Sequence, residues 1–170
     1  MTHRFRTVAI ILVVILTTAG IALSVRQQLS SQASQPAANA LETDEESVAG
    51  AKGAVIDFLT ALHDKRYAEA ETFYGSDYGL LWNWNPTVES SDHAALWKNG
   101  CEMNGLVCLE IRNLAVAEHP DAKTYVVNVW LSNADKTEFT TEFGQTMFPF
   151  TVAKLDNGTF EVQTMPPYQE

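Results

Sequence analysis

The two cysteines are the residues whose spacing most directly indicates chemistry. Cys101 and Cys108 are the only cysteines among 170 residues, and seven positions separate them. Outside the cytoplasm such a pair most simply forms a disulfide, which would close a loop of about eight residues and contribute roughly 2.5 kcal/mol. No further ligands stand at the spacing of a metal site. We therefore predict a disulfide and no metal, with free thiols as the alternative if the domain were cytoplasmic.

The four histidines indicate no catalytic motif. His3, His63, His93 and His119 are scattered, and none has a metalloprotease or nucleophile-elbow context. Each is more simply a surface or helix-end residue. The carboxylate of Asp92, directly before His93, is explained by helix capping alone. We assign no catalytic residue and expect no cofactor.

The tryptophans are the more suggestive set. Four tryptophans among many phenylalanines and tyrosines could line a pocket or form an exposed interaction surface, with core filling as the alternative. They are Trp82, Trp84, Trp97 and Trp130. The first two lie in the segment LLWNWNP, whose asparagines and proline suit a loop or an edge better than a helix.

Helices are expected in the first half of the domain. One apolar face recurs at spacings of three and four and predicts a helix that ends near His63 or Asp64. Its members are Val48, Ala51, Val55, Phe58, Leu59 and Leu62. A second short helix is predicted over 67–74, stopped by Gly75. A third is predicted over 94–99, capped by Ser91-Asp92, with Gly100 in the left-handed position that follows a helix.

After Cys101 the apolar pattern changes to that of strands. Runs of β-branched and aromatic residues predict strands over 107–116, 124–131, 137–143, 147–154 and 159–163. Their predicted connections are Pro120-Asp121, Asn133-Ala134-Asp135 and Asp156-Asn157-Gly158, of which Asn-Gly is the strongest hairpin signal. Helices followed by an antiparallel meander predict an α+β domain with the helices against one sheet face.

The N-terminal segment predicts a membrane anchor. Residues 7–25 contain no charge, and about 19 helical residues span roughly 28 Å, close to the hydrocarbon thickness of a bilayer. A cleaved signal is the alternative, although its apolar core is normally shorter. Arg4 and Arg6 on the leading side favour a cytoplasmic N-terminus. We therefore predict a cytoplasmic tail (1–6), a transmembrane anchor (7–25), a flexible stalk (26–43) and an extracytoplasmic domain (44–170).

The part of the chain after the anchor is strongly acidic. From Arg26 onward there are 9 basic and 21 acidic residues, which gives a net charge of −12. Nucleic-acid binding depends on Lys and Arg displacing counterions from phosphates, so we expect no nucleic-acid partner. The simplest reading of the acidic charge is that it keeps the domain soluble.

Two stretches of the domain resemble a known family. VIDFLTALHDKRYAEAETFYGSD is similar to the first two helices of the NTF2-like, cystatin-like cone fold, and FTVAKLDNGTFEVQTMPPY is similar to its last hairpin. The resemblance covers roughly 46–167 and consists of order and spacing. It implies a curved antiparallel sheet, helices on one face and pairing of two copies through their sheets. A helix-on-sheet domain without a cavity is the alternative.

The resemblance also implies where an active site would lie. NTF2-like enzymes place an Asp or His base and a tyrosine inside the cone, where low polarity tunes the pKa of the base. Asp57 lies next to the apolar face of the first helix, and Tyr74, Tyr78 and Tyr125 are available as partners, but the sequence places no pair of them inside the cone. The solvent side of an amphipathic helix is the simpler explanation of Asp57.

Three functions remain open from the sequence. A membrane-tethered module that binds a protein or a small ligand is favoured, because a flexible stalk lets a domain search for partners near the membrane. An anchor, a stalk and an NTF2-like ectodomain together resemble the architecture of inner-membrane scaffolds of type IV secretion, which are not enzymes. The alternatives are a cavity enzyme of isomerase, dehydratase or hydrolase type and a passive structural protein of the cell envelope.

Overall fold

The computed structural model describes residues 44–169. The predicted tail, anchor and stalk lie outside the described residues. Within 44–169, no helix combines the length and the apolar character that crossing a bilayer requires.

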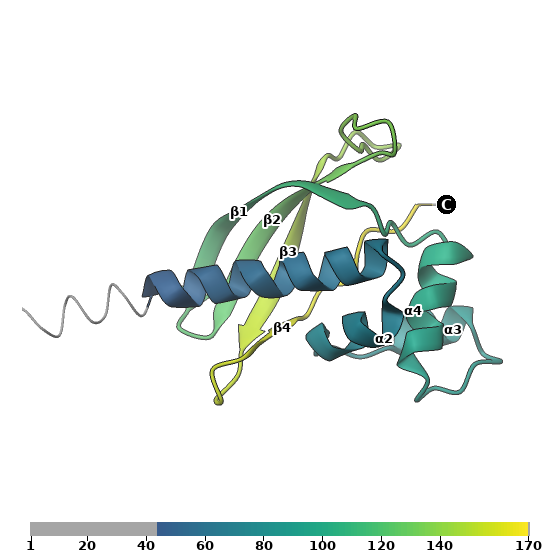
Figure 1. Cartoon of the computed structure of the whole chain (residues 1–170), viewed down its shortest axis with the longest axis horizontal. Coiled ribbons are helices and arrows are strands. Elements are labelled where there is room, and N and C mark those ends of the chain that lie inside the picture. The colour runs from purple at the N-terminus through teal and green to yellow at the C-terminus, as the bar shows by residue number, and fades with distance from the viewer. Residues whose placement is uncertain (1–43, 170) are drawn as a thin grey trace, which may run out of the picture. The chain divides into compact units, whose positions relative to one another are not determined.

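The first described element is a long helix over residues 44–63. The predicted apolar face is buried at five of its six positions, and Val48, the sixth, is half-buried. The helix ends at residue 63, as its pattern predicts, and Lys65 then adopts a left-handed conformation with φ of +62°. Figure 1 shows this helix lying across one face of the sheet.

The sheet is an antiparallel meander of four strands in the order β1-β2-β3-β4. The strands are β1 (Glu110–Asp121), β2 (Thr124–Ser132), β3 (Met147–Lys154) and β4 (Phe160–Val162). On β2 every second side chain is buried, from Tyr125 to Leu131, which is the alternation of a sheet with one covered face. The predicted α+β class and the antiparallel order are confirmed.

One predicted strand is wrong. Residues 137–143 form an irregular connection, in which only the bridge between Ser132 and Glu138 has strand pairing. Phe139 is buried against Phe148, with ring centroids 5.8 Å apart, while Phe143 is 90% exposed. The aromatic residues that suggested a strand therefore anchor a loop at one point instead of alternating along an edge.

Three short helices and a 3-10 turn gather at the C-terminal end of the long helix (Figure 1). They are α2 (Tyr67–Ala70), η1 (Glu71–Phe73), α3 (Gly79–Trp84) and α4 (His93–Glu102). Asp92 caps α4 as predicted, because its carboxylate accepts a 3.0 Å hydrogen bond from the Ala95 amide.

Helices α3 and α4 lie side by side in matched register. The indole of Trp97 donates to the Tyr78 hydroxyl at 3.3 Å, and Leu81 approaches Gly100 closely. Asn85 bonds Asn104 at 3.0 Å. Each pair is separated by nineteen residues. The two helices therefore run in the same direction.

This packing overturns two sequence expectations. The segment LLWNWNP contributes residues to α3 instead of forming a loop, because Leu81 is fully buried and tertiary packing outweighs weak local propensity. Gly100 does not follow α4 but lies inside it, where a Cβ would stand 3.0 Å from Leu81. The left-handed glycine that follows α4 is Gly105, with φ of +81°.

Large aromatic side chains fill the interior of the domain. Phe58 on the long helix, Phe150 on β3 and Trp97 on α4 are all fully buried. The rings of Phe58 and Trp97 meet edge to face, with centroids 5.4 Å apart. The interior between helix and sheet is therefore packed with side chains.

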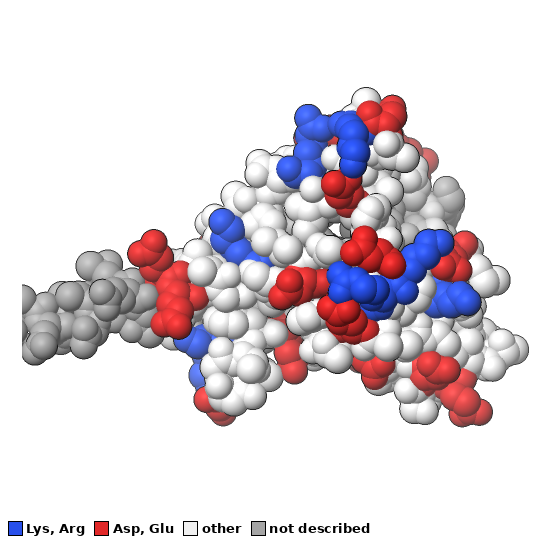
Figure 2. Space-filling view, in the orientation of Figure 1, with Lys and Arg blue, Asp and Glu red and all other residues white. Residues whose placement is uncertain are grey.

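Charges of both signs are mixed on the surface. Figure 2 shows acidic and basic groups next to one another on the face that carries the long helix. Lys65 pairs with Glu102 at 3.4 Å, and Lys136 pairs with Glu110. Exposed ion pairs of this kind stabilise a fold only slightly.

Candidate functional site

The predicted disulfide between Cys101 and Cys108 is present. It joins the last turn of α4 to the segment that leads into β1, with the two Cα atoms 5.6 Å apart. The bond closes a short loop, which we call the disulfide loop (101–108). A short covalent loop restricts the unfolded chain and favours one arrangement of its residues.

The C-terminal segment pairs with the disulfide loop. The Val107 amide donates to the Pro167 carbonyl at 2.8 Å, and the Gln169 amide donates to the Gly105 carbonyl at 3.0 Å. Leu106 and Tyr168 are the paired residues between them. These contacts form a small antiparallel ladder.

A glycine is required at position 105, where the chain leaves the turn after α4 and enters this ladder. Its backbone has a φ of +81°, which side-chain-bearing residues rarely adopt. A Cβ there would also lie 2.2 Å from the carbonyl oxygen of Gln169. Only glycine allows the C-terminal segment to approach so closely.

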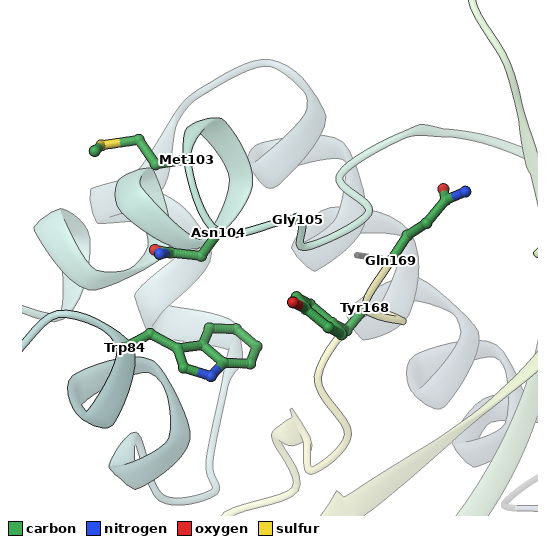
Figure 3. Close-up of a pocket in the computed structure, with 6 residues that line it drawn as sticks. All are labelled: Trp84, Met103, Asn104, Gly105, Tyr168 and Gln169. Atoms are coloured by element: carbon green, nitrogen blue, oxygen red, sulfur yellow. The ribbon is translucent and has the colours of Figure 1, made fainter.

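The ladder forms one wall of a groove of about 420 Å³. Figure 3 shows the rings of Trp84 and Tyr168 turned toward one another, and their centroids lie 5.0 Å apart. The groove is lined by Trp84, Met103, Asn104, Gly105, Tyr168 and Gln169. None of these side chains carries a charge. We call this feature the Trp84 groove.

Asn85 holds the two sides of the groove together. Its buried side-chain amide donates to the Leu81 carbonyl at 2.8 Å and to the Asn104 side chain at 3.0 Å. One amide therefore closes the end of α3 and fixes it to the disulfide loop. Hydrogen bonds of buried amides give such contacts a defined geometry.

Several large apolar side chains at this end of the molecule remain exposed. Met103 is 75% exposed, and Tyr168 is 48% exposed. Leu80 is 49% exposed and lies one helical turn before Trp84, on the same side of α3. A group of exposed apolar side chains around a concave site is typical of a surface that binds another molecule.

The structure separates the four tryptophans. Trp97 is fully buried and therefore belongs to the core, while Trp130 is half-buried on the sheet face opposite the long helix. Trp82 is 43% exposed but lies on the side of α3 away from Trp84. Among the predicted set, Trp84 alone lines the groove.

Sequence reasoning missed the other residues of the groove. The segment between the two cysteines contains Met103, Asn104 and Gly105, and the cysteines were its main sequence signal. The other two residues, Tyr168 and Gln169, follow the last strand. The only available signal was the sequence Asn104-Gly105, which favours a turn.

The structure brings no predicted base to a tyrosine. Asp57 is exposed, and Tyr125 is buried with its hydroxyl 3.5 Å from the Ala122 carbonyl. Tyr74 and Tyr78 pack against Trp97, and burial raises the pKa of Tyr78 to about 12. Within 44–169, no Asp or His side chain is hydrogen-bonded to a tyrosine.

A carboxylate does contact a different tyrosine. The Tyr67 hydroxyl donates to Glu102 at 3.1 Å. Burial and this bond raise the pKa of Tyr67 to about 12, and the same bond together with Lys65 lowers the pKa of Glu102. Both shifts keep the phenol protonated and the carboxylate charged, which stabilises the contact but transfers no proton.

The described histidines have structural partners. His93 stacks on Tyr78, with centroids 3.7 Å apart, and its Nδ1 lies 3.2 Å from a Glu71 carboxylate oxygen. His119 lies beside Tyr125, with ring centroids 6.2 Å apart. Neither histidine lines the Trp84 groove.

His63 borders a second hollow, of about 590 Å³, between the long helix and β1. Its Nδ1 lies 3.3 Å from the Cys108 carbonyl oxygen. On the opposite wall the pKa of Glu110 is lowered, chiefly by its hydrogen bond to Lys136. The residues from 44 to 169 contain no group of three metal-ligating side chains placed to hold an ion.

No model of a protein family matches this sequence, and no curated protein is significantly similar to it.

Proposed function

We propose that this chain is a membrane-tethered, extracytoplasmic protein-interaction module whose docking surface is the Trp84 groove. The observation that carries the proposal is that the exposed side chains of Met103 and Tyr168 belong to residues lining a concave site whose described residues are uncharged. Apolar surface of this kind gains free energy when another molecule covers it.

The location rests on the residues before the domain. An uncharged apolar run over 7–25, preceded by Arg4 and Arg6, supports a single anchor with the domain outside the cytoplasm. The Cys101–Cys108 bond agrees with an oxidising compartment. The proposal of an anchor fails if the mature N-terminus is found near residue 41 in a soluble fraction.

The domain is further proposed to have an NTF2-like fold. This proposal is supported by the order of its elements, in which a long helix and short helices precede a four-stranded antiparallel meander. Pairing of two copies through their sheets goes with this fold proposal, and sedimentation of the full chain in detergent would test it.

Binding is better supported than catalysis. Phe58, Trp97 and Phe150 occupy the interior in which a cone-fold enzyme would hold its substrate. The six described residues that line the Trp84 groove carry no carboxylate, imidazole, amine or thiol. General acid–base chemistry needs such a group within reach of the substrate.

Photo-crosslinking in intact membranes tests the docking surface. A benzophenone amino acid replaces Met103, whose side chain is exposed at the groove, in the full chain. We expect discrete crosslinked products with another protein. Trp84→Ala in the same chain should abolish them, because it removes one wall of the groove.

Trp82→Ala is the matched control, because Trp82 is exposed on the same helix but outside the groove. It should leave the products unchanged. Equal crosslinking in the Trp84→Ala and Trp82→Ala chains would refute docking at the groove.

A further inference from the structure

We propose that the Trp84 groove takes an extended peptide segment, which adds as a strand beside Pro167–Gln169 and inserts one apolar side chain against Trp84 and Tyr168. This inference rests on the proposed function and names the class of partner that the docking surface accepts.

The backbone of Tyr168 offers an open edge for such a strand. In the small ladder, Leu106 and Tyr168 face each other but do not hydrogen-bond each other. The two hydrogen bonds join the residues on either side of them, Val107 with Pro167 and Gln169 with Gly105. In an antiparallel pair of this type, the N–H and C=O of the central residues point away from the ladder. Those of Leu106 face α4, where its amide donates to the Gly100 carbonyl at 2.9 Å.

The N–H and C=O of Tyr168 point to the opposite edge. They have no hydrogen-bond partner among residues 44–169. An unpaired edge of this kind is a template for another extended chain, whose main chain supplies the hydrogen bonds. One residue of the added strand can pair with both groups of Tyr168.

The Trp84 groove, which Tyr168 also lines, selects the side chain. The rings of Trp84 and Tyr168 face each other there, and Met103, Asn104, Gly105 and Gln169 complete the lining. In a strand added by pairing, every second side chain points to the same face. A single Leu, Met or aromatic residue of the segment would therefore enter the groove, and a charged residue would lose its hydration without gaining an ion pair from any of the described lining residues.

The negative charge of the domain favours basic residues at both ends of the bound peptide segment. The chain from Arg26 onward carries a net charge of −12, while the groove itself is uncharged. A segment with basic residues on either side of its apolar residue is attracted to such a domain, and an acidic segment is repelled. The expected ligand is thus extended, apolar at its centre and basic at its ends.

The test uses the full chain in nanodiscs and a dye-labelled heptapeptide of sequence Lys-Thr-Val-Leu-Val-Thr-Lys, capped at both ends. Binding is measured by fluorescence anisotropy. We expect replacement of the central Leu by Asp to weaken binding at least about tenfold. Trp84→Ala in the protein should weaken it at least about tenfold, and Trp82→Ala should not change it.

Backbone methylation tests strand addition directly. Two versions of the peptide carry N-methyl groups on alternate amides, one on the odd and one on the even positions. A strand uses only every second residue on one edge for hydrogen bonding, so one version should lose binding and the other should retain it. Equal affinities of the two versions would overturn pairing with the Tyr168 edge.

The remaining outcomes are also decisive. If neither the parent peptide nor versions with Phe or Met at the centre bind at about 1 mM, which corresponds to about −4 kcal/mol, the extended segment is the wrong partner class. If crosslinks from position 103 still formed and still depended on Trp84, the groove would remain a docking surface, and only the proposal of an added strand would be wrong. Loss of both results would reject the proposed function itself.

Discussion

Trp97 and Trp84 stand near each other in the sequence and have opposite surroundings. Trp97 is fully buried, and its ring contacts Phe58, Tyr74 and Tyr78. Trp84 is half-buried; among residues 44–169 its ring contacts that of Tyr168 alone, and it faces an open groove. We call the first region the Trp97 cluster.

The difference between the two regions indicates where function lies. The Trp97 cluster satisfies its apolar side chains internally, so it contributes stability and leaves no room for a ligand. At the Trp84 groove, a glycine turn, a covalent loop and a buried amide hold apolar side chains in place without covering them. Apolar groups that remain exposed on a well-held framework are suited to binding.

The largest expected effect is on stability. Trp97→Ala should lower the free energy of unfolding by about 3–5 kcal/mol, because it leaves a cavity in a packed cluster. Trp84→Ala should lower it by only about 1 kcal/mol. Urea unfolding of both variants measures the two values. Equal losses would contradict the division into a core region and a docking region.

Removal of the disulfide should have the next largest effect. Cys101→Ser combined with Cys108→Ser should cost about 2.5 kcal/mol, because the unfolded chain regains the entropy of the loop. Hydrogen exchange should show faster loss of protection at the Val107 and Gln169 amides than at amides of β2 and β3. Uniform acceleration across the domain would mean that the bond does not act on the groove in particular.

Two glycines with the same φ allow a test of the role of the ladder. Gly105 and Gly144 both have φ of +81°, but a Cβ at Gly144 meets nothing within 4 Å. Gly144→Ala should cost about 1 kcal/mol for the left-handed backbone alone. Gly105→Ala should cost about 1–2 kcal/mol more, because the Cβ collides with the Gln169 carbonyl. Thermal unfolding of the two variants measures the difference in stability. Equal losses of stability would show that the C-terminal segment shifts to accommodate the Cβ at no cost.

The smallest expected effect is a dependence on alkaline pH. The pKa of Tyr78 is about 12 in the folded protein, above its ordinary value of about 10, so folding favours the protonated phenol. The corresponding stability is complete below about pH 10 and is lost as the pH rises through about 12. Tyr78→Phe should reduce this alkaline loss, measured by urea unfolding at several pH values. An unchanged loss would assign the effect to Tyr67, whose pKa is also about 12.

Local pattern predicted most of the framework. The period of the long helix depends on residues within one turn, so its apolar face and its end near residue 63 were readable without a structure. The same holds for β3, predicted over 147–154 and found over Met147–Lys154, and for the Asp92 cap. The errors include Gly100, which lies inside α4, and the predicted turn Pro120-Asp121, which lies inside β1. They also include α3 and 137–143, where a long-range contact of Leu81 or Phe139 decided the conformation.

The sequence by itself determined the α+β order of elements, the acidic charge and the pairing of its only two cysteines, because each depends on composition or on neighbours along the chain. Which tryptophan lines an open groove was decided only by the tertiary structure. The Trp84 groove joins α3, the disulfide loop and the C-terminal segment, which are brought together by contacts between residues far apart in sequence. Such contacts follow from packing of the whole domain, and no local period records them.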